Sequence, residues 1–157
     1  MSKPSPIQAG SKAPKFSFVQ DEKTFTIGQM EGPALIYFYP KDDTPGCTKQ
    51  ACGVRDLWLR FQREGLHVVG ISKDGEDSHE KFKKKYSLPF PLVSDEDLKI
   101  ARAYGVFGEK QFMGKTYEGV HRMSFLVAAD GTILKTYEKV RPTEHAETVL
   151  EDLAAAH

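Results

Sequence analysis

The pattern of apolar and polar positions along the chain predicts alternating strands and helices. Residues 34–39 and 66–71 form short, mostly apolar runs, which is typical of strands buried on both faces of a sheet. Between them, residues 45–64 carry apolar side chains at spacings of three and four, which is typical of a helix with one buried face, and Gly65 suits the end of that helix. A strand, a helix and a second strand in this order indicate a parallel pair with a helical crossover.

The rest of the chain completes an α/β pattern. Two hairpins are predicted, one near the N-terminus and one across the turn at 129–131, because each joins two strand-like runs through a short polar turn. The glycine-rich segment 105–119 is expected to be a long loop. The further elements expected are strands at 15–19, 23–27, 92–93, 124–128 and 132–137, and helices near 77–86, 95–104 and 143–155.

No repeat or low-complexity linker divides the sequence, so residues 1–157 are expected to form one domain. The element order predicts an α/β fold with a central mixed β-sheet flanked by helices and an N-terminal β-hairpin. With 39% hydrophobic residues, the chain has enough apolar side chains for one core of this size.

The charge balance and the N-terminus narrow the functions to consider. The sequence has 22 basic and 22 acidic residues, which gives no charge excess for binding nucleic acid or an anionic membrane. The first ten residues lack the apolar stretch of a signal peptide, and no apolar run approaches the roughly 20 residues that span a bilayer. We therefore expect a cytoplasmic protein without nucleic-acid or membrane partners.

The sequence gives no indication of a metal or cofactor. Its five histidines form no i,i+4 pair and have no cysteine at a zinc-ligand spacing, although His121 is close enough to Arg122 in sequence to face a site there. The glycines of 105–119 lack the order of a nucleotide-binding fingerprint. We expect no metal and no cofactor.

The first of the two cysteines, Cys47, is placed where a thiol becomes reactive. Thr44 is a good N-cap and Pro45 suits the first helical position, so Cys47 falls in the first turn of the predicted helix. Free N–H groups and the positive end of the helix dipole favour thiolate there. The helix also follows the buried strand 34–39, and the carboxyl ends of strands are where α/β sheets place their chemistry. The alternative is an inert, buried cysteine, since free cysteine is among the most buried residue types.

The second cysteine, Cys52, lies five residues later on the same predicted helix. That spacing corresponds to a Cα separation of roughly 8–9 Å, whereas a disulfide requires less than about 7 Å. Either Cys52 is idle, or the helix unwinds locally each time the two thiols pair. Gly53 weakens the helix at that point, by about 1 kcal/mol relative to alanine.

Two segments resemble a known family. The pattern Pro40-x-x-x-Thr44-x-x-Cys47 resembles the active-site signature of the peroxiredoxins, and the surrounding residues 38–48 are similar to the bacterioferritin-comigratory-protein, or PrxQ, subfamily. Residues 104–127 resemble a later block of that subfamily, which carries its active-site arginine, here Arg122. The resemblance extends from about Ala9 to the C-terminal helix, and it implies a thioredoxin-like fold.

The resemblance implies a thiol-dependent reduction of hydrogen peroxide and organic hydroperoxides. Cys47 would attack one peroxide oxygen while the other leaves as hydroxide or alkoxide. Thr44 would donate its hydroxyl to the peroxide and the thiolate, Arg122 would supply a fixed cation with a planar fork of donors, and Pro40 would shield the sulfur from water.

The resemblance also assigns a role to Cys52. A cysteine at this position commonly resolves the sulfenic acid in the subfamily, and the predicted helix at 77–86 contains no cysteine that could replace it. An intramolecular Cys47–Cys52 disulfide, recycled by thioredoxin or a similar dithiol in a monomeric enzyme, is therefore implied. The alternative function is a thioredoxin-like thiol–disulfide oxidoreductase or redox-sensing module, against which the C-x-x-C spacing of such proteins is absent.

Overall fold

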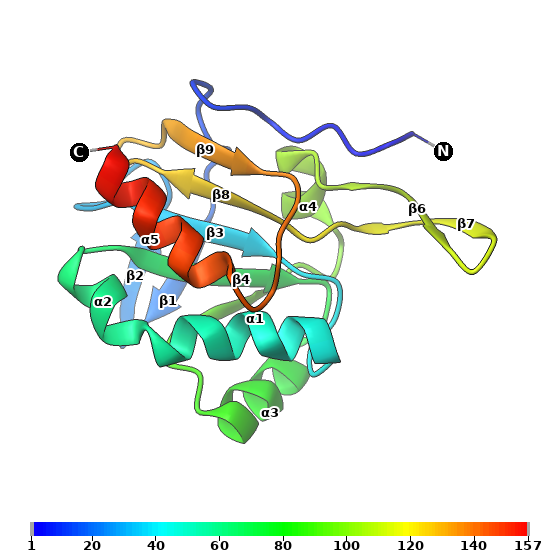
Figure 1. Cartoon of the computed structure of the whole chain (residues 1–157), viewed down its shortest axis with the longest axis horizontal. Helices are drawn as coiled ribbons and strands as arrows, with labels where there is room; N and C mark the ends of the chain where they lie inside the picture. Colours follow the sequence, from blue (N-terminus) through cyan, green and yellow to red (C-terminus); the bar gives the residue numbers. More distant parts are fainter. Residues whose placement is uncertain (1, 157) are drawn as a thin grey trace.

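The computed structural model describes residues 2–156 and has a five-stranded mixed sheet at its centre (Figure 1). The strand order is β5-β4-β3-β8-β9, with β3, β4 and β5 parallel and with β8 and β9 antiparallel to their neighbours. The strands of this sheet are β3 (Ala34–Phe38), β4 (His67–Ser72), β5 (Leu92–Ser94), β8 (Met123–Val127) and β9 (Ile133–Tyr137). The predicted central mixed sheet is confirmed.

Two apolar layers cover the two faces of this sheet. Along β3, Leu35 and Tyr37 point to one face and Ile36 and Phe38 to the other, as the two-residue repeat of a strand requires. On the first face the strand residues pack with buried residues of α1, α2, α3 and α5, and on the second they pack with α4 and the N-terminal hairpin. The helices are α1 (Pro45–Asp56), α2 (Trp58–Arg63), α3 (Glu76–Tyr86), α4 (Lys99–Tyr104) and α5 (His145–Ala155), and the N-terminal hairpin is β1 (Ser17–Gln20) with β2 (Lys23–Thr26).

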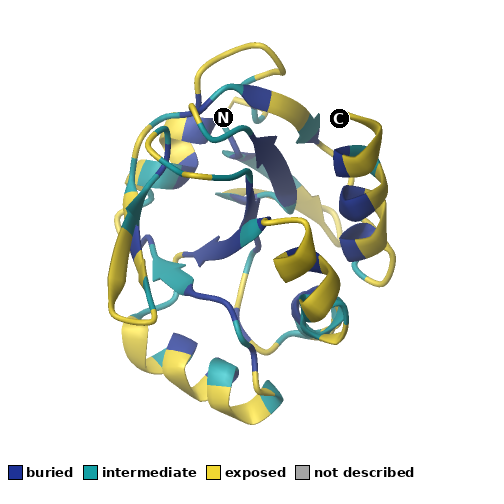
Figure 2. Ribbon diagram, turned by 90° about the vertical axis from the view of Figure 1, so that its left-hand side faces the viewer, coloured by how far each residue is buried: buried dark blue, intermediate teal, exposed yellow. Residues whose placement is uncertain are grey.

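The burial pattern follows these layers. Every residue of β3 is buried, as the apolar run predicted. Figure 2 shows the central strands in the colour of buried residues, whereas α5, the helix that leads to the C-terminus, is buried on its inner side and exposed on its outer side. Within residues 2–156, we find no helix with the length and apolarity needed to cross a membrane.

The prediction of a long loop at 105–119 is wrong. The segment forms a second hairpin, β6 (Phe107–Phe112) with β7 (Lys115–Val120), which projects from the body of the molecule (Figure 1). Met113 and Gly114 both have positive φ, at 50° and 78°, as the two-residue turn of a hairpin requires. Most of the hairpin is exposed or half-buried, so its sequence lacks the apolar alternation by which a strand is recognised.

Two helices also differ from the prediction. The helix expected over 45–64 is interrupted at Leu57 (φ −106°, ψ 16°), after which Trp58 packs on Phe90 with ring centroids 6.0 Å apart. The helix expected from residue 95 begins only at Lys99. Asp95 remains outside it, and its carboxylate accepts hydrogen bonds from the N–H groups at positions 100 and 101, at 3.0 and 2.8 Å. Asp95 therefore accepts hydrogen bonds from free N–H groups in the first turn of α4 without being part of the helix.

Gly70 on β4 provides a test of how tightly the first face is packed. A Cβ at this position would lie 2.8 Å from Cδ2 of Leu92 and 2.9 Å from the hydroxyl oxygen of the fully buried Tyr37. We expect Gly70→Ala to lower the free energy of unfolding by about 1–3 kcal/mol, because a packed core does not absorb an extra methyl group. Urea denaturation of the reduced protein measures the change.

Gly53 provides the matched control. A Cβ there would meet only ordinary contacts, 3.7 Å from the carbonyl oxygen of Pro142 and 4.0 Å from Cβ of Ala146, and alanine favours a helix. Gly53→Ala should leave stability unchanged or raise it. Equal stabilities of the two variants would show that the contact of Tyr37 with the Gly70 backbone is not tight.

Candidate active site

Cys47 occupies the first turn of α1, at the carboxyl end of β3. Pro45 is the first helical residue and Thr44 is the N-cap, with the extended dihedrals (φ −91°, ψ 155°) typical of that position. The Cys47 side chain is buried, within the core that α1 forms against the sheet. The predicted position of Cys47 at a helix start is confirmed.

The side chain of Thr44 does not cap the helix, contrary to the expectation that a threonine there would. Its hydroxyl instead donates a hydrogen bond to the carbonyl oxygen of Lys41, at 3.0 Å. The N–H groups of the first turn therefore receive no side-chain oxygen from Thr44 and remain available to an anion beside Cys47.

Arg122 lies in contact with the thiol, although 75 residues separate them in sequence. Strand β8 pairs antiparallel with β3 so that Met123 faces Phe38, and this register places the preceding residue, Arg122, where the chain leaves β3. Nη2 of Arg122 donates a hydrogen bond to Sγ of Cys47 at 3.2 Å. The structure thus brings together the thiol and the arginine that the sequence singled out.

Gln50 is a residue of the site that the sequence analysis missed. It is buried, and its Oε1 accepts a hydrogen bond from Nη1 of Arg122 at 2.8 Å. The guanidinium therefore has one terminal nitrogen on Cys47 and the other on Gln50. The available signal was the spacing, because residues three apart on a helix share a face and Gln50 follows Cys47 by three.

Gly46 makes room for the guanidinium. A Cβ at this position would lie 2.9 Å from Nη2 of Arg122, so a larger side chain would push the arginine away from the sulfur. The absence of a side chain at position 46 is thus explained by steric contact with Arg122, independently of backbone flexibility.

Pro40 lines a cavity of about 310 Å³ between the loop after β3 and the β6–β7 hairpin. Lys110 of β6 lines the same cavity and donates a hydrogen bond from Nζ to the carbonyl oxygen of Val120, at 2.9 Å. Burial lowers the pKa of Lys110, and repulsion from Arg122 lowers it further. The ring of His121 faces the hairpin, where its Nε2 lies 2.9 Å from the carbonyl oxygen of Glu109.

The second cysteine remains separate from the first. Both thiols are free, Cys47 buried and Cys52 half-buried, and both lie within the continuous helix α1. This is the arrangement in which the two sulfurs cannot bond without a change of the helix.

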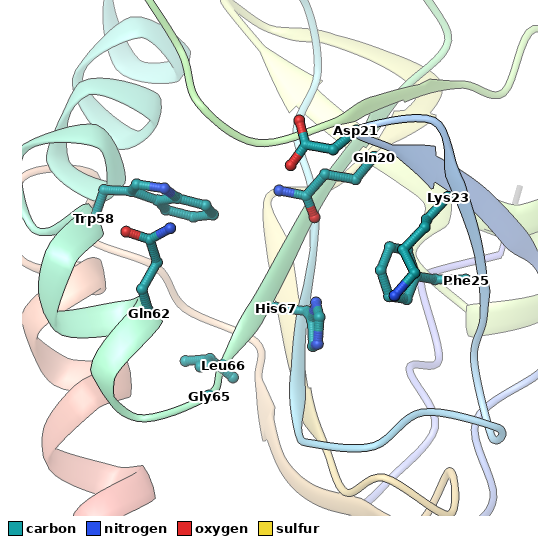
Figure 3. Close-up of a pocket in the computed structure, with 9 residues that line it drawn as sticks. All are labelled: Gln20, Asp21, Lys23, Phe25, Trp58, Gln62, Gly65, Leu66 and His67. Atoms are coloured by element: carbon teal, nitrogen blue, oxygen red, sulfur yellow. The ribbon is translucent and has the colours of Figure 1, made fainter.

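A second cavity of about 320 Å³ lies elsewhere, between the N-terminal hairpin and α2. Figure 3 shows Trp58 on one side of it and Phe25 and His67 on the other. None of the five residues singled out from the sequence lines this cavity. Cys47, which is buried, therefore lies in a different part of the molecule.

The chain resembles proteins of a known family. The chain matches the AhpC/TSA family over residues 9–136. It is 44% identical over 146 residues to a putative peroxiredoxin bcp of Coxiella burnetii, covering 92% of this chain and 97% of that protein. It is 45% identical over 148 residues to the peroxiredoxin Bcp of Escherichia coli K12, covering 93% of this chain and 95% of that protein.

Solved structures give the same result. A structure of the bacterioferritin comigratory protein of Xanthomonas campestris, studied for its alkyl peroxide reduction activity, has a TM-score of 0.77 at 38% identity and covers 82% of each chain. The peroxidoxin BcpB of Mycobacterium tuberculosis has a TM-score of 0.81 at 30% identity, covering 96% of this chain and 99% of that one.

The contact between Arg122 and Cys47 generates the first prediction about reactivity. In Arg122→Lys the charge remains, but one ammonium cannot hold the sulfur and Gln50 together in the geometry of the planar fork. We expect the second-order rate of reduced protein with hydrogen peroxide to fall roughly tenfold or more, which corresponds to about 1.4 kcal/mol of transition-state stabilisation. Stopped-flow measurement gives the rate, and Arg63→Lys, an exposed arginine of α2, serves as the control. Equal rates in the two variants would show that Arg122 does not contribute to the reaction with peroxide.

Proposed function

The chain belongs to the AhpC/TSA family as a peroxiredoxin, a thiol-dependent peroxidase of thioredoxin-like fold, and we propose that Cys47 is the thiol that attacks the peroxide. The observation that carries this proposal is the 3.2 Å contact between Nη2 of Arg122 and Sγ of Cys47 in the first turn of α1. An arginine and the N–H groups of a helix start both favour a negatively charged sulfur. No observation favours the thioredoxin-like oxidoreductase over the peroxidase.

The proposed reaction is a displacement at oxygen. The sulfur electron pair of Cys47 forms a bond to one peroxide oxygen, the O–O bond breaks, and the leaving hydroxide or alkoxide takes up a proton. The cysteine becomes a sulfenic acid. Arg122, held by Gln50, is placed to stabilise both the attacking thiolate and the charge that develops on the leaving oxygen.

We assign supporting roles to Thr44 and Pro40. The Thr44 hydroxyl donates to the carbonyl of Lys41, so donation to a peroxide requires it to exchange that acceptor for the substrate. Pro40 lacks an N–H group and lines the cavity beside the loop, which suits a residue that limits the access of water.

We propose that Cys52 resolves the sulfenic acid. Its thiolate attacks the sulfur of Cys47, the S–O bond breaks as the disulfide forms, and the leaving hydroxide takes up a proton to become water. A dithiol reductant, thioredoxin or a similar protein, then restores both thiols by disulfide exchange. The proposed substrates are hydrogen peroxide and organic hydroperoxides, and the proposed form of the enzyme is a cytoplasmic monomer.

The assignment of Cys47 has a direct test. Cys47→Ser should abolish peroxide consumption with dithiothreitol or thioredoxin as the reductant, because a serine hydroxyl is essentially un-ionised at neutral pH. Cys52→Ser is the matched control, and it should still consume one equivalent of peroxide in a single turnover. Substantial turnover by Cys47→Ser would overturn the assignment.

The role of Cys52 predicts that the cycle opens a helix. One equivalent of peroxide should yield protein with a Cys47–Cys52 bond and faster hydrogen exchange across residues 44–55, while β3 stays protected. Gly53→Ala stiffens α1 by about 1 kcal/mol and should slow disulfide formation by up to about fivefold, without slowing the reaction of Cys47 with peroxide. Two free thiols after oxidation, an intermolecular bond, or an unchanged exchange pattern would instead indicate a one-cysteine mechanism.

A further inference from the structure

Asp42 and His79 form a buried pair that the proposed reaction does not use. The two residues are only 8% and 4% exposed, and Nδ1 of His79 lies 2.7 Å from Oδ2 of Asp42. The other ring nitrogen of His79, Nε2, lies 3.1 Å from the carbonyl oxygen of Val93 on β5. The pair thus connects the loop after β3 with α3 and, through the histidine, with the edge strand of the sheet.

The contacts of His79 fix the number of protons in the pair. The carbonyl of Val93 can only accept, so Nε2 must carry a hydrogen. Nδ1 faces a carboxyl oxygen, so one further proton lies between Nδ1 and Asp42, whichever of the two carries it. Without that proton, a lone pair on nitrogen would face a carboxylate at 2.7 Å in a buried site, which is strongly unfavourable.

Asp42 is fully engaged by its surroundings. Its Oδ1 accepts a hydrogen bond from the Tyr39 hydroxyl at 2.6 Å, and its Oδ2 accepts one from the Ser78 hydroxyl at 2.8 Å. Burial raises the pKa of this carboxyl group, but hydrogen bonds from His79, Tyr39 and Ser78 outweigh burial and hold the pKa below its usual value. The carboxylate is therefore a fixed centre to which several parts of the chain are attached.

The position of Asp42 in the sequence connects the buried pair with the proposed site. Asp42 lies between Pro40 and Thr44, two residues from each, and its backbone N–H donates to Oδ2 of Asp74 at 2.8 Å. The loop that carries both proposed site residues, and from which α1 begins, is thus attached to α3 in the interior through the Asp42 side chain. Loss of this attachment therefore changes the support of the first turn of α1 directly.

We infer that Asp42 and His79 are positioning residues that hold the loop 40–44, and with it the first turn of α1, in the closed form that reacts with peroxide. The inference rests on the proposed function, because the open form of α1 is the one in which Cys52 can reach Cys47. When either partner is removed, the other stays buried but loses its contact at 2.7 Å, and opening of the loop hydrates it. The pair therefore sets the balance between reaction with peroxide and disulfide formation.

The quantity to measure is the ratio of two rates. The first is the rate of sulfenic acid formation at Cys47 in a Cys52→Ser background, and the second is the rate of disulfide formation with Cys52 present, each in a single turnover. In Asp42→Ala the ratio of disulfide formation to peroxide reaction should rise about tenfold, because the open form becomes more populated. Formation of sulfinic acid at excess peroxide should fall in the same variant, since faster resolution leaves less sulfenic acid to be oxidised.

A conservative variant distinguishes positioning from bulk packing. In Asp42→Asn the new amide nitrogen can donate to Nδ1 of neutral His79 and to the Ser78 hydroxyl, while the amide oxygen accepts from Tyr39. All three hydrogen bonds survive without the shared proton, so the ratio should stay within about twofold of the unaltered protein. His79→Leu removes the histidine contact and leaves the Ser78 hydrogen bond to Asp42, so it should raise the ratio in the same direction as Asp42→Ala but by less.

Two controls complete the design. Asp130→Asn alters an exposed aspartate that pairs with Lys12 at 3.3 Å, and Ile133→Ala destabilises the core at the far edge strand β9. Neither should change the ratio, although Ile133→Ala should lower the midpoint of urea denaturation. If Asp42→Ala fails to fold, Ser78→Ala removes one donor from the carboxylate and should raise the ratio about threefold.

The outcomes separate the two proposals. If Cys47→Ser retains activity, the proposed function itself is wrong, whatever the loop variants do. If Cys47→Ser is inactive but Asp42→Ala gives the same ratio as Ile133→Ala, the pair has no positioning role. Where Asp42→Ala does not fold, the ratio in Ser78→Ala is compared with that in Ile133→Ala instead. An equally large rise in Asp42→Asn would also overturn the inference, because hydrogen bonding would then not be what holds the loop.

Discussion

A sulfur atom that is to carry negative charge inside a protein needs donors that are already in place, because water is excluded and an unpaired buried charge is costly. In this chain the donors come from two directions. The first turn of α1 supplies its free N–H groups beside Cys47, and Arg122 reaches the sulfur from the start of β8. The arrangement depends on the antiparallel register of β3 and β8, since a shift by one residue would send Arg122 to the opposite face of the sheet.

The same helix start must satisfy two opposing requirements. In the proposed cycle, reaction with peroxide needs α1 closed, so that Cys47, Gln50 and Arg122 keep their contacts. Disulfide formation needs α1 open, because a spacing of five positions along a helix separates the two Cα atoms by roughly 8–9 Å. A very stable first turn would trap the sulfenic acid, and a very weak one would lose the thiolate site. Gly46 and Gly53 lower the stability of the helix, whereas the attachment of Asp42 to α3 raises it.

The parts of the fold that were predictable from the sequence are those buried on both sides. The runs at 34–39 and 66–71 are apolar because both faces of their strands pack against other layers, and this leaves a local signal. The β6–β7 hairpin is largely exposed, so its strands leave little periodic signal. Cys47 was recognisable because a helix start is a local pattern.

The contacts that complete the site are less visible, because they join residues far apart in sequence. Gln50 is recognisable as part of the site only once the position of Arg122 is known, and the partner of Asp42 lies 37 residues away on α3. The N-cap pattern at Thr44 identified the helix start correctly but not the direction of its hydroxyl, since a competing acceptor, the Lys41 carbonyl, lies within the same loop.

The loop before α1 has two acidic residues in succession, and their different surroundings indicate which one controls the helix. Asp43 pairs with Lys85 at 2.7 Å and with the Tyr86 hydroxyl at 2.8 Å, but on the exposed surface, where salt and water compete and such pairs contribute little. Asp42 makes its contacts in the interior, where a broken pair leaves an unpaired polar group and the cost is several times larger. The exposed pair can therefore form and break while the loop keeps its shape. The buried pair can break only if the loop moves, and this makes Asp42, rather than Asp43, the residue that ties the state of the loop to the state of the helix.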